Sequence, residues 1–419
     1  MKIFPLAFAS LLNRKFTVIL TIIAIALSVA LLVGVERIRS GAQTGFNNTI
    51  SGTDLIVGAR TGQIQLLMYS VFRLGNATNN ITWESYEDIV DDPVVGWSVP
   101  MSLGDSHRGY AVLGTSKEYF EHFRYGRKQA LTMREGKVYD DLFDAVVGSE
   151  VAAKLNYQVG SEIIVAHGTG STSFSEHKDK PFVVSGVLER TGTPVDRTVH
   201  VSLEAIEAIH IGWQTGSLNA QDQVSADEAR KLELQAENIT AFLVGVKSKL
   251  GIFKLQRKVN QYTEEPLLAI LPGVALQELW RLLGVAEKAL FAISVCVVIT
   301  GLIGMLSVIL ASLNERRREM AILRSCGARP IHVFSLLIGE AFLVTLCGIA
   351  TGLALLYAVM ALVRPTIEER FGLYLSIAPP NIGELGLLLA IIVAALIVAV
   401  LPALMAYRNS LADGLTLRV

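Results

Sequence analysis

The stretch Phe16–Val35 reads FTVILTIIAIALSVALLVGV, twenty residues without a charged side chain. An α-helix rises about 1.5 Å per residue, so a helix of this length just crosses a hydrocarbon core of about 30 Å. The run is also longer than the roughly 7–15 apolar residues of a secretory signal peptide. It therefore predicts a membrane-spanning helix over residues 16–36 rather than a cleaved leader.

Three more segments of this kind lie in the C-terminal third, at Ala289–Leu313, Val333–Val363 and Leu385–Tyr407. Each exceeds the threshold of about 18 residues for a spanning helix. The composition agrees with this pooling of apolar residues, because 51% of the 419 residues are hydrophobic and only 18% are charged, against about 25% charged in a soluble chain. The sequence therefore predicts four spans and excludes a soluble multidomain protein.

Charge and cysteine content exclude two further classes. The formal net charge is −1, which gives no overall case for a nucleic-acid binder, because such proteins carry basic domains. The three cysteines, Cys296, Cys326 and Cys347, lie in or beside the apolar segments. They cannot build a disulfide framework in the polar middle of the chain.

Basic residues predict the orientation in the membrane. Lys2, Arg14 and Lys15 precede the first span without an acid, and the loop 313–332 holds five arginines against two glutamates. An excess of Lys and Arg is retained on the cytoplasmic side. The region 37–280, with 23 basic and 29 acidic residues, is then periplasmic, and both termini are cytoplasmic. We expect the following segments in a bacterial inner membrane: 1–15 cytoplasmic amphipathic helix, 16–36 first span, 37–280 periplasmic domain, 281–313 second span with a periplasmic extension, 314–332 cytoplasmic coupling helix or loop, 333–363 third span, 364–384 short periplasmic loop, 385–407 fourth span and 408–419 cytoplasmic tail.

The region 37–280 mixes strand-like and helix-like patterns. Short β-rich runs bounded by Gly, Pro or Asp occur at Asp54–Gly58, Gly109–Leu113, Glu162–Ala166, Pro181–Ser185 and Ala241–Gly245. Helical spacing occurs at Trp83–Val90, Leu203–Ile209, Leu250–Tyr262 and Glu278–Lys288. The predicted fold class is an α-helical membrane protein with four transmembrane helices and a large α+β periplasmic domain inserted between the first two. The polar stretch 220–237 is expected to be a solvated helix or a linker.

Motifs for catalysis are absent from the 419 residues: no G-x-S-x-G, no H-E-x-x-H and no G-x4-G-K-[S/T] occurs. We therefore expect no enzyme activity and no ATP site in these residues. Six of the seven histidines fall in the polar middle, and His167 and His177 flank a Gly/Ser/Thr-rich loop. That pair is a weak candidate for metal binding, and the alternative is a solvated hairpin tip.

The most specific motif is the loop between the second and third spans, LNERRREMAILRSCGARP at 313–330. As a helix it presents a few apolar anchors among arginines, and Gly327 followed by Pro330 ends it. Such a short charged helix suits insertion into a groove on a cytoplasmic partner. Retention of positive charge inside explains the arginines but not their ordered pattern. The residues expected to make that contact are Glu315, Arg316, Glu319, Met320, Leu323, Arg324 and Gly327.

This loop resembles that of the four-span permeases of the MacB/FtsX/LolC type of ABC transporters, the type VII or mechanotransmission family. The family pattern Arg-x-x-Glu-[Ile/Met]-x-x-Leu-[Arg/Lys]-x-x-Gly-[Ala/Ser] is matched from Arg316 to Ala328. The resemblance extends to the basic start at 6–15, to the tail from Pro402, where Gly414 replaces a common proline, and to the segment 193–201.

The resemblance implies that the loop is the coupling helix, which docks on a nucleotide-binding subunit. It implies two copies of a separate ATPase subunit that holds ATP and magnesium, and a second permease copy as a homodimer or a related heterodimer. The stand-alone form without a fused ATPase domain is expected to bind a periplasmic partner protein and membrane lipid, no nucleic acid and no cofactor of its own.

Polar and small residues within the spans give further candidates. Glu340 is an acid inside the third span, for which ion transport and a structural or coupling role are alternatives; we favour the latter. Small residues let helices approach closely. The candidates for helix packing are Gly301, Gly304, Gly348 and Gly352.

Few polar residues lie in the spans, so the work is expected at the periplasmic side. The leading hypothesis is a permease subunit that couples ATP hydrolysis by its partner to a movement of the periplasmic domain, for export, extrusion or lipoprotein handling. The alternatives are a regulatory scaffold that actuates a partner such as a cell-wall hydrolase, and a metal-handling ABC system.

Overall fold

The computed structural model describes residues 15–168, 177, 179–211, 224–315, 322, 325, 327–371 and 377–408. The chain divides into two compact units. Residues 1–42 and 283–419 form one, called the helical unit below, and residues 43–282 form the other, called the sheet unit.

Four helices in the described residues are long and apolar enough to cross a membrane, which confirms the predicted four. They are α2 (Lys15–Thr49), α10 (Pro272–Glu315), α12 (Pro330–Phe371) and α13 (Ile382–Arg408). Helix α2 continues past the predicted end at residue 36, and α12 continues past residue 363. An apolar run marks the part of a helix that suits hydrocarbon, whereas helical hydrogen bonding carries on into the polar residues that follow.

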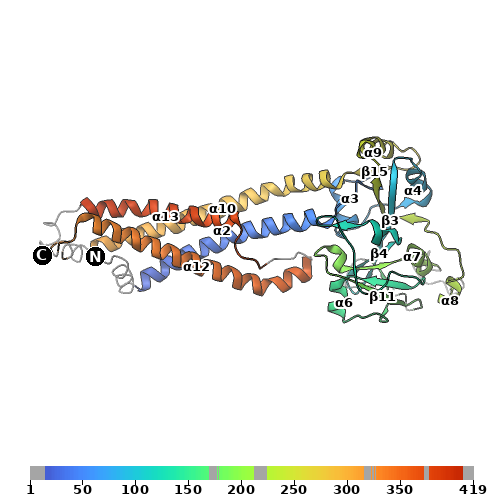
Figure 1. Ribbon diagram of the computed structural model, residues 1–419, viewed down its shortest axis with the longest axis horizontal. Coiled ribbons are helices and arrows are strands. Elements are labelled where there is room, and N and C mark those ends of the chain that lie inside the picture. The colour runs from blue at the N-terminus through green and yellow to red at the C-terminus, as the bar shows by residue number, and fades with distance from the viewer. Residues whose placement is uncertain are drawn as a thin grey trace. The chain divides into compact units, whose positions relative to one another are not determined.

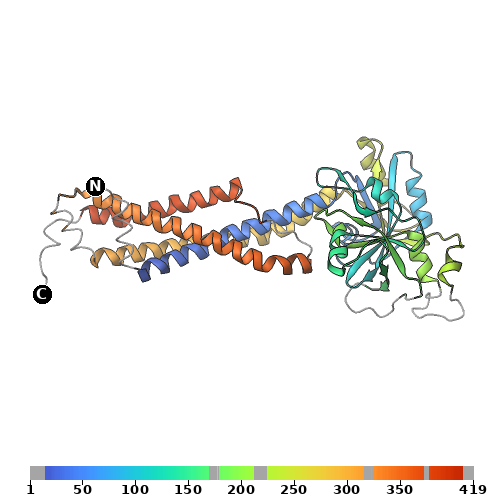
Figure 2. The same cartoon turned by 60° about the horizontal axis from the view of Figure 1, so that its bottom comes forward.

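The helical unit is built around α2, and Figures 1 and 2 show its four helices packed side by side. Ile25, Val29 and Val33 of α2 are buried in one apolar cluster with side chains of the other three helices. The outward residues Ile19 and Leu27 are exposed, as suits side chains that face lipid. Because lipid is as apolar as these side chains, close packing and polar contacts hold the helices together rather than the hydrophobic effect.

One buried ion pair joins three of these helices. Arg37 of α2 donates from Nε and Nη2 to the two carboxylate oxygens of Glu384 in α13, at 3.0 and 2.9 Å. Its Nη2 also donates to the hydroxyl of Tyr357 in α12 at 3.2 Å, and the guanidinium lies 5.0 Å from the centre of that ring. Only 8% of Arg37 and 2% of Glu384 are exposed.

Helix α13 begins at this ion pair with a reciprocal cap. The Asn381 side chain accepts a hydrogen bond from the Glu384 backbone N–H at 2.8 Å, and Glu384 Oε2 accepts one from the Asn381 N–H at 3.1 Å. A capping box of this kind satisfies backbone donors that the first turn of a helix leaves without partners. Glu384 therefore both starts α13 and neutralises Arg37.

The sheet unit contains a mixed sheet with the strand order β15-β1-β14-β3-β4-β12-β8-β11-β7, to which β9 and β10 add at β11 and β3. Most pairs are antiparallel, but β4 with β12 and β8 with β11 are parallel. The strands are β1 (Leu55–Ala59), β3 (Val95–His107), β4 (Tyr110–Thr115), β7 (Met133–Gly136), β8 (Asp144–Val147), β9 (Glu162–Ile163), β10 (Ala166–His167), β11 (Phe182–Leu188), β12 (Thr198–Val201), β14 (Ala241–Val246) and β15 (Leu267–Ile270).

The remaining elements are short. The helices are α3 (Gln63–Ser70), α4 (Trp83–Val90), α5 (Glu118–His122), α6 (Ser149–Leu155), α7 (Leu203–His210), α8 (Ala226–Ala229) and α9 (Ile252–Asn260), with 3-10 turns η1 (Pro194–Arg197) and η2 (Lys249–Gly251). Two small ribbons pair β2 (Ile81–Thr82) with β13 (Asn238–Ile239) and β5 (Arg124–Tyr125) with β6 (Gln129–Ala130). Together with the mixed sheet, they confirm the predicted α+β domain between the first two spanning helices.

Alternation along the strands separates two apolar cores. In β1, Ile56 packs into one cluster with α3 and α5, whereas Leu55 and Val57 pack into another with α4 and α9. Successive strand residues point to opposite faces, so helices cover both sides of this half of the sheet. A third cluster lies around β8, β11 and β12 with α6 and α7.

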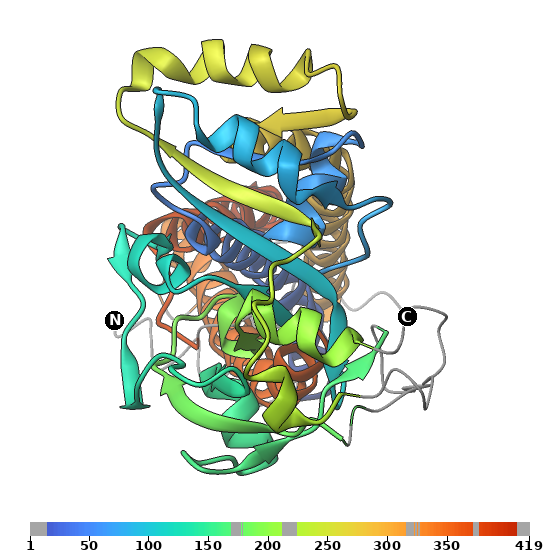
Figure 3. The same ribbon diagram turned by 90° about the vertical axis from the view of Figure 1, so that its right-hand side faces the viewer.

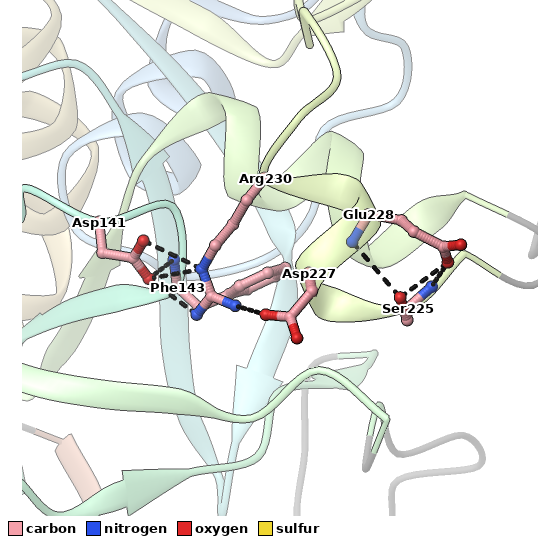
Figure 4. A network of polar contacts seen from close by, with 6 residues as sticks. All are labelled: Asp141, Phe143, Ser225, Asp227, Glu228 and Arg230. Carbon is pink, nitrogen blue, oxygen red and sulfur yellow. Dashed lines mark hydrogen bonds and ion pairs between the residues drawn. The ribbon is translucent and has the colours of Figure 1, made fainter.

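A polar network attaches α8 to the loop before β8 (Figure 4). Arg230 donates from Nε and Nη2 to Asp141, at 2.9 to 3.1 Å, and its guanidinium lies 5.2 Å from the centre of the Phe143 ring. Ser225 and Glu228 form a capping box at the start of α8. The predicted polar stretch 220–237 thus contains one short, capped helix, and its first four residues lie outside the described residues.

His200 of β12 is a titratable residue with no solvent exposure. Its Nδ1 donates to the Val146 carbonyl at 3.2 Å, and Nε2 has no hydrogen-bond partner among the described residues. Burial, reinforced by the positive charge of Arg73, lowers the pKa of His200 to about 3. His200 is therefore neutral in the folded domain at any pH at which the domain works.

The sheet unit should lose stability in mild acid because of His200. Below an ordinary pKa of about 6.5 the unfolded chain binds a proton that the folded chain does not, which lowers the free energy of unfolding by about 1.4 kcal/mol per pH unit until the folded pKa is reached. His200→Asn keeps a donor toward Val146 and removes the titration. Urea unfolding of the solubilised chain at pH 7 and pH 5, followed by tryptophan fluorescence, measures the difference, since all four tryptophans lie in residues 43–282.

The control variant is His122→Asn, which changes a half-buried imidazole stacked on Trp97. The pH slope of this variant gives the effect of replacing a histidine that is not fully buried. Equal pH slopes for the wild-type chain and His200→Asn would contradict the assignment.

The Arg37–Glu384 pair should be strongly coupled. Removing one member of a buried pair leaves an uncompensated charge and typically costs about 3–5 kcal/mol, whereas replacing both members by apolar residues costs much less. Glu384→Gln and Arg37→Leu should therefore each destabilise the helical unit, and Arg37→Leu with Glu384→Leu should be more stable than the sum predicts. Loss of helical circular dichroism on titration with SDS measures this.

A matched control is the ion pair Glu36–Arg39, whose two members flank Arg37 in α2 and are more exposed. Glu36→Gln should cost no more than about 1 kcal/mol. If Glu384→Gln proves as mild as Glu36→Gln, the buried pair does not hold the helices together.

Candidate functional site

The candidate coupling segment lies between α10, which ends at Glu315, and α12, which begins at Pro330. Of its predicted residues, Arg316, Glu319, Met320, Leu323 and Arg324 lie outside the described residues. Gly327 is described, with φ at +93°, in the left-handed region that favours glycine. A glycine in this conformation commonly follows the last residue of a helix, which agrees with the predicted stop at Gly327.

Both ends of the segment are held by one apolar cluster. Leu313 of α10, Val333 and Leu337 of α12, and Ala403 and Ala406 of α13 are buried together. The turn into α12 is closed by a hydrogen bond from the Arg329 backbone N–H to His332 Nδ1 at 3.0 Å. The ends of three spanning helices thus meet where the segment is attached.

Ile322 and Ser325 are described in the middle of the segment. Ser325 donates from its hydroxyl to the Ile322 carbonyl at 2.8 Å. Ile322 is 50% exposed. An exposed isoleucine in a segment whose sequence holds several arginines is the kind of apolar anchor that a partner groove accepts.

Glu340 lies in α12, about two turns beyond the cluster at Val333, and is half-buried. Glu384 is a second acid, at the start of α13, and is paired with Arg37. Sequence reasoning identified Glu340 but missed Arg37, Tyr357 and Glu384. The available signal was Asn381-x-x-Glu384 directly before an apolar run, which is the pattern of a capping box.

Three of the four candidate glycines lie against α2. A Cβ on Gly352 would lie 2.7 Å from the Ala26 carbonyl oxygen, and one on Gly348 would lie 2.6 Å from Ile25 Cγ2. A Cβ on Gly301 would lie 2.9 Å from the hydroxyl of Ser28. No side chain larger than hydrogen fits at Gly348 or Gly352 without a shift of α2 against α12.

Ser28 adds a polar contact to this helix packing, whereas Gly304 takes no part in it among the described residues. The Ser28 hydroxyl donates to Ala24 in its own helix at 2.8 Å and lies 3.2 Å from the Val297 carbonyl oxygen of α10. Gly304 has no heavy atom within 4 Å of where its Cβ would lie. Within the described part of the chain, Gly304 is therefore open toward the outside of the helical unit.

The two candidate metal ligands lie in different settings. His167 belongs to β10, and its side chain is outside the described residues, as are the loop residues 169–176. His177 is buried, and its ring centre lies 5.8 Å from that of His210. The described residues contain no group of three or more His, Cys, Asp or Glu side chains placed to hold a metal ion.

Two protein families match this chain. The MacB-like periplasmic core domain matches residues 18–235, which is more than half of the chain. The FtsX-like permease C-terminal region matches residues 291–411. The first match covers most of α2 and the sheet unit as far as residue 235, and the second covers most of the last three spanning helices; residues 236–290, with β14, α9 and β15, lie in neither.

Curated relatives include two export proteins named MacB. The macrolide export ATP-binding/permease protein MacB of Shewanella sp. (strain W3-18-1) is 23% identical over 369 residues, which cover 85% of this chain and 52% of that protein. MacB 1 of Yersinia pestis bv. Antiqua is 24% identical over 337 residues, which cover 79% of this chain and 47% of that protein. The chain thus spans about half the length of these relatives.

Solved structures with some similarity include the periplasmic region of MacB from Actinobacillus actinomycetemcomitans, at 11% identity and a TM-score of 0.34, over 55% of this chain and 94% of that one. The extracellular domain of the noncanonic ABC-type transporter YknZ from Gram-positive bacteria is 13% identical with a TM-score of 0.31, over 52% of this chain and 99% of that one.

The family match covers more than half of the residues, and the chain has four spanning helices with a large domain inserted between the first two. This chain belongs to the FtsX/MacB family of ABC-transporter permeases.

Proposed function

We propose that this protein is the permease subunit of an ABC transporter. In this transporter a separate ATPase subunit hydrolyses ATP, and the permease converts the energy of hydrolysis into a conformational change of its periplasmic domain. The work done at the periplasmic side is export, extrusion or lipoprotein handling. Family membership supports the permease role, and the arrangement of polar groups in the helical unit supports work outside the membrane.

The observation that carries the proposal is how the buried hydroxyls of the helical unit are used. Thr21, Ser294 and Thr345 each donate to a carbonyl one turn earlier in their own helix, at 2.7 to 2.9 Å, and Ser28 does the same. A pathway for a polar substrate needs such groups to face a cavity. The described residues of one chain offer no such lining, so the proposal places the substrate on the periplasmic side.

The helices offer a direct route for movement. Helix α10 is one element from Pro272 to Glu315, so its two ends are the last part of the sheet unit and the start of the coupling segment. The boundaries between the two units fall inside α2 and α10. We infer that a push on the coupling segment passes along α10 and α12 and reaches α2 through the packing at Gly301 of α10 and at Gly348 and Gly352 of α12.

The proposal includes the complex and its place in the cell. Two ATPase subunits, each with ATP and magnesium, bind the coupling segments of two permease copies in a bacterial inner membrane. The termini face the cytoplasm, and the sheet unit faces the periplasm. If the periplasmic partner is instead a cell-wall hydrolase, the same device regulates it; the protein that co-purifies with the complex distinguishes the two roles.

Substitution of two anchors in the coupling segment should uncouple the complex. Glu319→Ala with Leu323→Ala removes an acid and an apolar side chain that the proposal assigns to the ATPase contact. Loss of anchors of this kind weakens binding by about tenfold or more. Co-purification of the ATPase and ATP turnover of the reconstituted complex should both fall.

Ser325→Ala is the control, because the Ser325 hydroxyl bonds only back to its own segment among the described contacts. It should assemble and turn over ATP as the wild type does. A double variant with wild-type assembly, ATP turnover and transport would refute the coupling role.

The orientation can be tested with single cysteines in a chain whose native cysteines are replaced by serine. Ser171→Cys should react with a membrane-impermeant maleimide in intact cells once the outer membrane is permeabilised, because the proposal places it in the periplasm. Ser325→Cys should react only after lysis. The reverse pattern would overturn the topology.

A further inference from the structure

The segment 246–262 has a charge opposite to that of the domain around it. It contains no acid, whereas the rest of the region 37–280 has 18 basic and 29 acidic residues. The segment covers the turn η2 and the helix α9. Its five cations are Lys247, Lys249, Lys254, Arg257 and Lys258.

One face of α9 is firmly packed. Leu255 and Val259 are fully buried against the sheet. Gln256 donates from its side chain to the Ala269 carbonyl at 3.1 Å, and Asn260 accepts from the Ala269 N–H at 2.7 Å. The helix is therefore fixed on β15, and its other face is presented in a defined position.

The outer face of η2 and α9 carries two exposed apolar side chains. Leu250 is 93% exposed and Phe253 is 70% exposed, the highest values for large apolar side chains among the described residues of the sheet unit. They lie three residues apart, beside Lys254 and Arg257, which are also exposed. Exposed apolar groups that are rimmed by charges mark binding surfaces.

Helix α4 lies beside α9 and has the opposite charge. Glu84, Glu87, Asp88 and Asp91 follow the spacing i, i+3, i+4, i+7, which places them on one helix face, and all four are exposed. Tyr86 and Ile89 on the opposite face of α4 are buried in the same apolar cluster as α9.

Direct contacts and Figure 3 place the two helices together. Lys258 pairs with Asp92 at 2.8 Å, and the Tyr262 hydroxyl donates to Asp88 at 2.7 Å. Figure 3 shows α9, in yellow, and α4, in light blue, on the same side of the sheet. We call this pair of exposed helix surfaces the α4/α9 face.

The contacts within the chain use only part of this charge. Lys249 pairs with Asp54, and the hydrogen bond from Lys258 holds the pKa of Asp92 below its usual range. Lys254 and Arg257 on α9, and Glu84, Glu87 and Asp91 on α4, have no ion pair with any described residue. The face therefore presents a positive strip and a negative strip to whatever binds it.

We propose that the α4/α9 face binds the same face of a second copy of this chain. A two-fold axis between the copies puts α9 of each against α4 of the other, so that both strips meet their opposites. An anionic lipid surface that attracts α9 would repel α4, and an unrelated protein would need the same two strips in mirrored order. The proposal rests on the proposed function, which puts two permease copies in one complex.

The test uses two differently tagged full-length copies in the same membrane, each with one cysteine in a background without the native cysteines. Leu250→Cys in one copy and Glu87→Cys in the other should form a disulfide between the two tags on mild oxidation. A bond within one chain is impossible, since each chain has one thiol. The control Val159→Cys, exposed but outside the face, should give no bond to Glu87→Cys.

Charge-reversal variants distinguish ion pairing between the two α4/α9 faces from mere proximity of the two cysteines. Lys254→Glu with Arg257→Glu on the Leu250→Cys copy should abolish the disulfide. Adding Glu84→Lys with Asp91→Lys to the Glu87→Cys copy should restore it, and this recovery also shows that the reversed chains are folded.

Two results overturn the proposal: no disulfide between wild-type faces, or a disulfide that charge reversal leaves unchanged. Co-purification of the ATPase with both tags is measured on the same samples. If two copies and the ATPase assemble without the disulfide, the docking face is refuted and the proposed function stands.

Discussion

A hydrocarbon layer about 30 Å thick supplies no hydrogen bonds, so every backbone polar group within it must be satisfied inside the protein. This constraint organises the helical unit. It requires long uninterrupted helices, and it returns the hydroxyls of Thr21, Ser28 and Thr345 to carbonyls of their own helices. It also explains why the buried charges Arg37 and Glu384 lie near the ends of the apolar runs of α2 and α13 and neutralise each other.

Local patterns in the sequence predicted the local structure well. The apolar runs gave the four spans, and the predicted helix over Trp83–Val90 coincides with α4. The run Glu162–Ala166 was predicted as one strand but is divided into β9 and β10, which pair with different strands, β11 and β3. Sequence periodicity reports that a residue is extended or helical, and it carries no information on which strand pairs with which.

Contacts distant in the sequence could not be predicted from it. Arg37 and Glu384 are 347 residues apart, and Arg37 looked like the first residue of a soluble domain. The close approach of Gly348 and Gly352 to α2 depends on the same tertiary packing. His177, expected next to a solvated loop, is buried near His210. Each depends on partners that only the folded chain brings together. Most of the predicted coupling residues lie outside the described residues, so their role rests on the family pattern.

The mixed charges of the α4/α9 face suit a contact that forms and separates in a working cycle. Exposed ion pairs contribute only about 0.2–1 kcal/mol each, and two apolar side chains add a modest amount, so the face alone would not hold two free molecules together. Two copies that share one complex need much less affinity, because their effective concentration is high. A strip of each sign, rather than one net charge, also fixes the register of the two domains, since a displaced or inverted partner would bring like charges together. In the proposed complex, a weak contact with a defined register would let ATP-driven movement in the helical unit change how the two domains face each other without first breaking a strong interface.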